Sequence, residues 1–192
     1  MRRSFLPFVA LALFAPSQSS AQETELTPIA DRSQIVALLA SYAGEWTGRG
    51  QTRSDFDDEL EAAACRLETV FDAATETLTN AGACANAVRA IDINGELTIT
   101  EDGSLTGGYF GGFDAAQLLE SGGVAYQEGF VVNARYQVEI RREVQEIDVE
   151  VRVGVPIVRD DGSTAFSMVV LVLDQDTSEY VEFSVMIFAL NS

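Results

Sequence analysis

The sequence predicts an all-β protein, an antiparallel barrel of roughly eight to ten strands with one short helix before its first strand. Apolar and polar residues alternate with a period of two through most of the chain after Gly44, as in strands with one face in a core. Turn-forming pairs such as Asp102-Gly103 and Asp161-Gly162 separate these runs. Short strands joined by turns within one domain are typical of a barrel, with a two-sheet sandwich as the alternative.

A short amphipathic helix is expected over residues 31–43. Asp31 and Gln34 form a capping-box pattern, and Gly44 follows the run as a stop signal. Between these signals, four apolar residues recur at helical spacing: Ile35, Leu38, Leu39 and Tyr42. We expect this helix to lie against one end of the barrel.

The strands follow from the alternating runs. They are expected at 45–54, 63–71, 76–85, 91–100, 104–110, 124–140, 144–158, 165–174 and 178–190. Residues 111–123 carry a second Asp-x-x-Gln pattern between glycines, which predicts a short helical turn. In the last strand, one face is expected to hold Val181, Phe183, Val185 and Ile187, and the outward face Tyr180, Met186 and Phe188.

The first 21 residues have the composition of an export signal. Arg2 and Arg3 precede an apolar run that is too short to span a bilayer, and small residues follow it. An ordinary secretory signal is favoured over a twin-arginine signal. We therefore expect a periplasmic or secreted protein without a membrane span, with a linker at 22–30 and one barrel domain at 31–192.

The charged residues exclude several functions. The chain has 30 acidic and 12 basic residues and a formal net charge of −18. Every basic residue is arginine, and no basic patch offsets the repulsion of phosphates, so no nucleic-acid partner is expected. Without histidine or lysine there is no Ser-His-Asp unit, histidine-ligated metal or Schiff-base lysine. We expect neither catalytic residues nor a cofactor or metal site.

Cys65 and Cys84 are the only cysteines. An even pair in an exported chain favours a structural disulfide, whereas a metal or redox role would need further ligands or a Cys-x-x-Cys pattern. With a turn near residues 72–75, the two residues fall almost opposite each other on neighbouring antiparallel strands.

The only tryptophan, Trp46, stands in the run YAGEWTGRGQTR. The longer run LLASYAGEWTGRG resembles the opening of calycin-type barrels, the lipocalins and their bacterial relatives. The resemblance implies a lipocalin-like barrel whose floor is formed by Gly44 and Trp46, while Gly48 and Gly50 let the strand coil. Lipocalins stack an arginine of the last strand on this tryptophan; the last strand here has none, and the candidates are Arg135, Arg141 and Arg142.

Two segments are candidate functional regions at the end opposite this floor. The connection 54–62 is acidic, so it is either a rim that favours a neutral or cationic guest or a solvated loop. Its acidic side chains are Asp55, Asp57, Asp58, Glu59 and Glu61. The glycine-rich run LTGGYFGGF, residues 105–113, is either an aromatic flap over a cavity or a strand end with core aromatics. With the next strand it gives the candidate ligand-binding residues Tyr109, Phe110, Phe113, Tyr126 and Phe130.

Two functions are consistent with these patterns. The first is an exported soluble carrier or sensor that holds a small apolar or neutral to cationic molecule inside the barrel. The alternative is a module that contacts or inhibits another envelope protein through the acidic rim.

Overall fold

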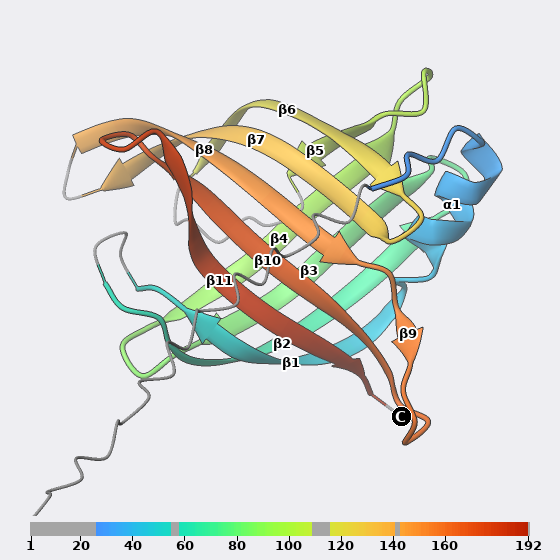
Figure 1. Ribbon diagram of the computed structural model, residues 1–192, viewed down its shortest axis with the longest axis horizontal. Coiled ribbons are helices and arrows are strands. Elements are labelled where there is room, and N and C mark those ends of the chain that lie inside the picture. Colours follow the sequence, from blue (N-terminus) through green and yellow to red (C-terminus); the bar gives the residue numbers. More distant parts are fainter. Residues whose placement is uncertain (1–25, 55–57, 109–115, 141–142, 192) are drawn as a thin grey trace, which may run out of the picture.

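Over the residues that it describes, the computed structural model shows a closed antiparallel barrel of ten strands, preceded by one helix, α1 (Arg32–Ala40) (Figure 1). The structure describes residues 26–54, 58–108, 116–140 and 143–191. The strands are β1 (Gly44–Thr52), β2 (Glu61–Asp72), β3 (Thr77–Ala85), β4 (Ala90–Ile99), β5 (Leu105–Gly108), β6 (Gln117–Tyr126), β7 (Gly129–Ile140), β8 (Glu143–Gly154), β9 (Ile157–Val158), β10 (Thr164–Asp174) and β11 (Glu179–Leu190). The predicted fold class is confirmed.

The ring closes because the last strand pairs with the first. β1 to β7 each pair with the next strand along the chain, β8 pairs with β10, and β11 pairs with both β10 and β1. The short strand β9 pairs with β10 alone and lies outside the ring. Between β4 and β6 the described pairing is confined to the α1 end, because β5 pairs with β4 only at residues 96–99 and with β6 only at Gly123.

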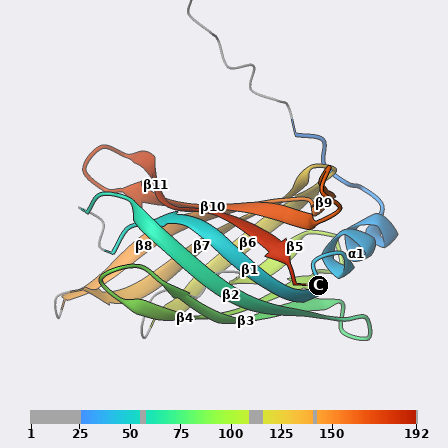
Figure 2. The same ribbon diagram turned by 90° about the horizontal axis from the view of Figure 1, so that it is seen from below.

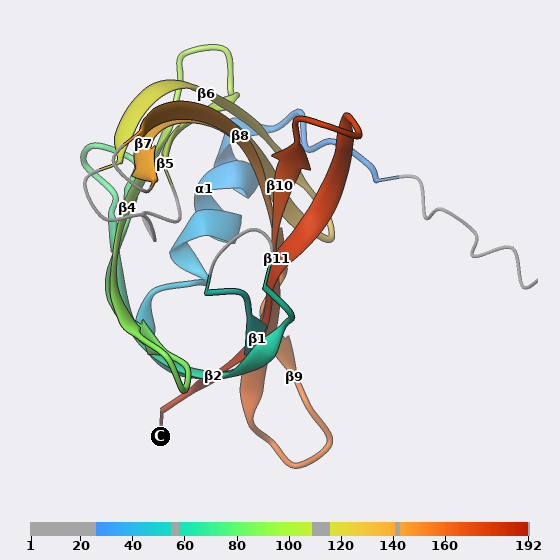
Figure 3. The same cartoon turned by 90° about the vertical axis from the view of Figure 1, so that its left-hand side faces the viewer.

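α1 closes one end of the barrel. Figure 1 and Figure 2 both place it beyond the strand ends on one side, and Figure 3, which looks along the barrel, shows it across the far end of the ring. The Asp31 carboxylate caps the helix by accepting hydrogen bonds from the backbone N–H and hydroxyl of Ser33. These bonds lower the pKa of Asp31. The Arg32 guanidinium anchors the helix to the turns at Glu76 and Thr100.

One segment that was predicted to be helical is a strand. Residues 117–123 belong to β6 and pair with β7, so the prediction of a helical turn is wrong for the described part of 111–123. Hydrogen bonds from β7 replace those of a helical turn, and an irregularity between Leu118 and Glu120 shifts the strand register there. The predicted strand at 124–140 is a hairpin that turns between Tyr126 and Gly129.

The segment before α1, predicted to be a linker, is partly bound to this hairpin. The backbone N–H of Ile29 donates to Ala125, and the N–H of Gln127 donates to Thr27. Pro28 forms a bridge with Tyr126. Residues 27–29 therefore extend the sheet beside β6.

A β-bulge in β11 reverses the predicted faces of the last strand. Val170 pairs with Ser184 and Leu171 with Glu182, so Phe183 is an extra residue in β11. An extra residue moves every later side chain to the opposite face. Met186 and Phe188, which were predicted to point outward, are 1% and 0% exposed, whereas Ile187 is 50% exposed. The prediction was therefore wrong from Ser184 onward.

The disulfide joins the inner faces of β2 and β3. Cys65 and Cys84 are directly paired, with 4.0 Å between their Cα atoms, and both side chains are buried. The predicted disulfide and the antiparallel pairing around it are confirmed.

Replacing both cysteines with alanine is expected to lower the free energy of unfolding by about 3 kcal/mol, because the bond closes a loop in the unfolded chain. Urea unfolding followed by circular dichroism measures the change, and the reduced wild-type protein should show a similar loss. An unchanged unfolding midpoint would contradict a stabilising role.

Candidate functional site: the barrel interior

The α1 end of the interior is packed with aromatic rings. The Trp46 indole is 1% exposed and meets the Phe166 ring edge to face, with 4.7 Å between ring centroids. Its Nε1–H donates a hydrogen bond of 2.9 Å to the carbonyl oxygen of Tyr42. The Phe188 ring stacks on Phe166 at 5.0 Å. Phe166 thus occupies the position against Trp46 where an arginine was expected.

The three arginine candidates do not take that position. Arg135 lies on the outer face of β7, where its Nε donates a hydrogen bond of 2.7 Å to Asp148, and this contact raises the pKa of Arg135. Arg141 and Arg142 lie outside the described residues.

The glycines of β1 make room for large side chains of β11. Gly48 pairs with Phe188 and Gly50 with Met186. A Cβ atom at Gly48 would lie 2.6 Å from the Phe188 ring, and one at Gly44 would lie 2.6 Å from the Leu190 side chain. The glycines of the Gly-x-Trp-x-Gly-x-Gly run therefore leave space for the large side chains of the last strand. The sequence analysis missed this relation because it placed Met186 and Phe188 on the outer face of that strand.

A cluster of aromatic rings lies at the α1 end, and the inner faces toward the other end carry small, polar and larger apolar side chains together. The largest fully buried side chains include four aromatic residues of the cluster at the α1 end, namely Trp46, Tyr42, Phe130 and Phe188. Farther along the same inner faces, small or polar-tipped residues lie among larger buried side chains such as Ile93, Tyr136, Val138 and Ile147. The small or polar-tipped residues are Gly50, Thr52, Ala63, Ala134 and Ser184.

Three of the inward polar residues lie side by side at the end opposite α1. Ser184 pairs with Thr52, and Thr52 pairs with Glu61, across β11, β1 and β2. We call these three residues the polar row. The Thr52 hydroxyl donates to the carbonyl oxygen of Phe183 at 3.3 Å, and the Ser184 hydroxyl donates to that of Gln51 at 3.4 Å.

Tyr136 is a further polar group in this half of the barrel. It lies on β7, six residues beyond Phe130, which corresponds to about 20 Å along a strand. Its side chain is buried, and burial raises the pKa of its phenol because the charged form loses its hydration. A Cβ atom at Gly108 would lie 2.6 Å from its hydroxyl oxygen.

Of the five predicted ligand-binding aromatics, the structure describes Phe130 and Tyr126, and both lie at the α1 end. Phe130 lies at the α1 end, where its ring meets Tyr42 edge to face at 5.3 Å, and Tyr126 is the last residue of β6 at the same end. Gly108, the last residue of β5, lies beside Tyr136. Tyr109, Phe110 and Phe113 themselves lie outside the described residues.

The acidic connection between β1 and β2 is at the end opposite α1, as the order of the strands requires. Asp58 and Glu59 are exposed, and the Arg53 guanidinium donates to the backbone carbonyl of Asp58. Asp55 and Asp57 lie outside the described residues. The structure therefore describes only part of the predicted acidic rim.

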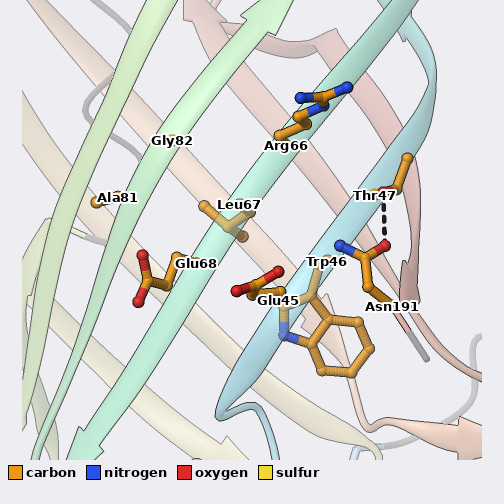
Figure 4. A pocket seen from close by; sticks show the side chains of 9 residues that line it. All are labelled: Glu45, Trp46, Thr47, Arg66, Leu67, Glu68, Ala81, Gly82 and Asn191. Atoms are coloured by element: carbon orange, nitrogen blue, oxygen red, sulfur yellow. Dashed lines mark hydrogen bonds between the residues drawn. The ribbon is translucent and has the colours of Figure 1, made fainter.

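Two grooves lie on the outer surface. One, of about 440 Å³, crosses β1, β2 and β3; Figure 4 shows Glu45, Glu68 and Arg66 around it. Glu45 and Glu68 are directly paired like charges, an arrangement that destabilises a sheet slightly. The other, of about 320 Å³, lies over β6, β7 and β8, beside the Tyr180 ring. The pKa of the Tyr180 phenol is raised by partial burial and by the nearby carboxylates of Glu150 and Asp148.

Comparisons with known proteins assign no family: no family model matches the sequence, and no curated protein matches it either. The closed barrel is compatible with the calycin-type resemblance of the Trp46 run. Within the described residues, no helix is long and apolar enough to cross a membrane. In the same part of the chain, no group of three or more cysteine, aspartate and glutamate side chains is placed to hold a metal ion.

Proposed function

We propose that the protein is an exported, lipocalin-like binding protein that holds a small, largely apolar molecule in the half of the barrel opposite α1. The observation that supports this proposal most is the contrast between the two halves. A cluster of aromatic rings packs the α1 end, whereas at the other end the small residues Gly50 and Ala63 and the polar row face inward beside aliphatic side chains and Tyr136. Apolar pockets with a few convergent polar groups are the usual form of small-molecule sites.

The proposal is tested by filling this half of the barrel. Ala63 lies on the inner face of β2, and Ala64 lies next to it on the exposed outer face. Replacing Ala63 with leucine is expected to weaken the binding of a lipophilic fluorescent probe at least tenfold, because the added side chain occupies the space of the guest. Ala64→Leu adds the same side chain outside and should leave binding unchanged.

Thermal unfolding of the two variants separates a hollow interior from a packed one. With room available, Ala63→Leu should unfold within a few degrees of the wild type, whereas overpacking a filled core costs about 1–3 kcal/mol. Native mass spectrometry of protein purified from the periplasm gives an independent readout of a bound guest. Apo mass alone, together with a strongly destabilised Ala63→Leu variant, would refute the proposal.

A further inference from the structure

Glu61 differs from the other acidic residues around the barrel mouth because it lies on the inner face. Burial alternates regularly along β2, and Glu61 is in phase with the buried residues Ala63, Cys65 and Leu67. Its side chain is partly exposed as a whole, but its Oε2 atom is buried and accepts no hydrogen bond from any described residue.

Among the described residues, no arginine forms an ion pair with this carboxylate. Arg49 and Arg66 lie on the exposed outer faces of β1 and β2. The Arg53 guanidinium donates to the backbone carbonyl oxygens of Glu182, at 2.7 Å, and Asp58. The chain has no lysine or histidine. A carboxylate oxygen removed from water without a donor is unfavourable, and such a group calls for a partner.

The hydroxyl groups of Thr52 and Ser184 can accept further hydrogen bonds but have no further proton to donate. Thr52 and Ser184 each donate to a backbone carbonyl, so their remaining hydrogen-bonding capacity is their oxygen lone pairs. Directly paired residues have Cβ atoms about 4.5–5.5 Å apart, so Thr52 is a close neighbour of both Ser184 and Glu61, which lie on the strands on either side of it. The row therefore presents three acceptors to the interior.

We propose that the polar row binds the protonated primary amine of an amphipathic guest, whose apolar part lies among the inward side chains of the barrel. An alkylammonium group has three donors and one positive charge, which matches the three acceptors and the single carboxylate. This inference rests on the proposed function and adds the chemical class of the guest.

The test compares three probes of equal chain length below their micelle concentrations: octylamine, octanol and octanoate. Binding is measured by displacement of the lipophilic fluorescent probe. The wild type should bind octylamine about tenfold more tightly than octanol, because a charge-assisted hydrogen bond is gained, and octanoate most weakly. Glu61→Gln should remove most of the difference between octylamine and octanol.

A second variant is the control for nonspecific attraction of the positively charged amine to the acidic surface. Glu68→Gln removes one negative charge from the exposed outer face of the same strand and should retain the preference for octylamine. Thr52→Val keeps the shape of the side chain but removes one acceptor, so it should reduce the preference severalfold. Thr52→Val also tests the polar row if the Glu61→Gln variant does not fold.

The outcomes separate this inference from the proposed function. If octanol binds as tightly as octylamine, or if Glu68→Gln reduces the preference as much as Glu61→Gln, the amine site is refuted while the apolar interior site stands. If none of the three probes displaces the fluorescent probe, and the probe itself does not bind, the proposed function fails and the amine site fails with it.

Discussion

Replacing Trp46 with alanine is expected to lower the free energy of unfolding by about 3–5 kcal/mol. The indole is buried against the Phe166 ring, and its Nε1–H bonds to the carbonyl oxygen of Tyr42 just after α1. The substitution would leave a cavity at the closed end and detach the strand from the segment that follows the helix. Urea unfolding at constant pH, followed by far-ultraviolet circular dichroism, measures the loss.

Trp46→Phe separates the two parts of this effect. Phenylalanine keeps an aromatic contact with Phe166 but lacks the N–H donor, so it should lose an intermediate amount of stability. Val144→Ala, at a side chain that is 66% exposed, is the control for shortening an apolar residue and should change stability by less than about 0.5 kcal/mol. A Trp46→Ala variant as stable as this control would show that the indole does not seal the barrel.

Local patterns predicted most of the fold. The helix was predicted from four apolar positions, a cap and a stop signal, and all four of those side chains are buried, although the helix ends at Ala40, before Tyr42 and Gly44. The disulfide was predicted because the turn after Asp72 fixes the register of Cys65 and Cys84. In both cases, residues close together in the sequence determine the structure, so no long-range information is needed.

The last strand shows where this reasoning fails. Residues 183–188 are nearly all apolar, so alternation alone does not show which face is buried. The bulge at Phe183 and the glycines of β1 decide it, because Gly48 and Gly50 leave space for Phe188 and Met186. That complementarity joins two segments at opposite ends of the chain and becomes visible only when the barrel closes.

The polar row was missed for a different reason. The sequence analysis grouped Glu61 with the acidic connection 54–62, although its spacing from Ala63 and Cys65 already matches the inner face of a strand. Thr52 likewise shares the parity of Trp46 in β1. Their partner Ser184 lies beyond the bulge, so its inward orientation could not be derived from alternation in the last strand.

Replacing Gly50 with alanine is expected to cost about 2–3 kcal/mol, although alanine is only one methyl group larger. A Cβ atom there would lie 2.0 Å from the backbone oxygen of Val185, so β1 and β11 would have to separate at the seam that closes the barrel. The control is Gly122→Ala in β6, where a Cβ atom meets nothing within 4 Å and stability should stay equal or rise slightly.

The atoms nearest to the added methyl group predict which substitution, Gly48→Ala or Gly50→Ala, can be rescued by a second substitution in β11. At Gly48 the three atoms nearest to the added methyl group all belong to the Phe188 ring, so shortening that residue to leucine in the Gly48→Ala background should recover part of the lost stability. At Gly50 the nearest atom is a backbone oxygen, and Met186→Ala should not rescue Gly50→Ala. The four unfolding free energies of each double-mutant cycle measure this difference. Equal rescue at both positions would mean that side chains, rather than the approach of the two backbones, limit how tightly the last strand closes the barrel.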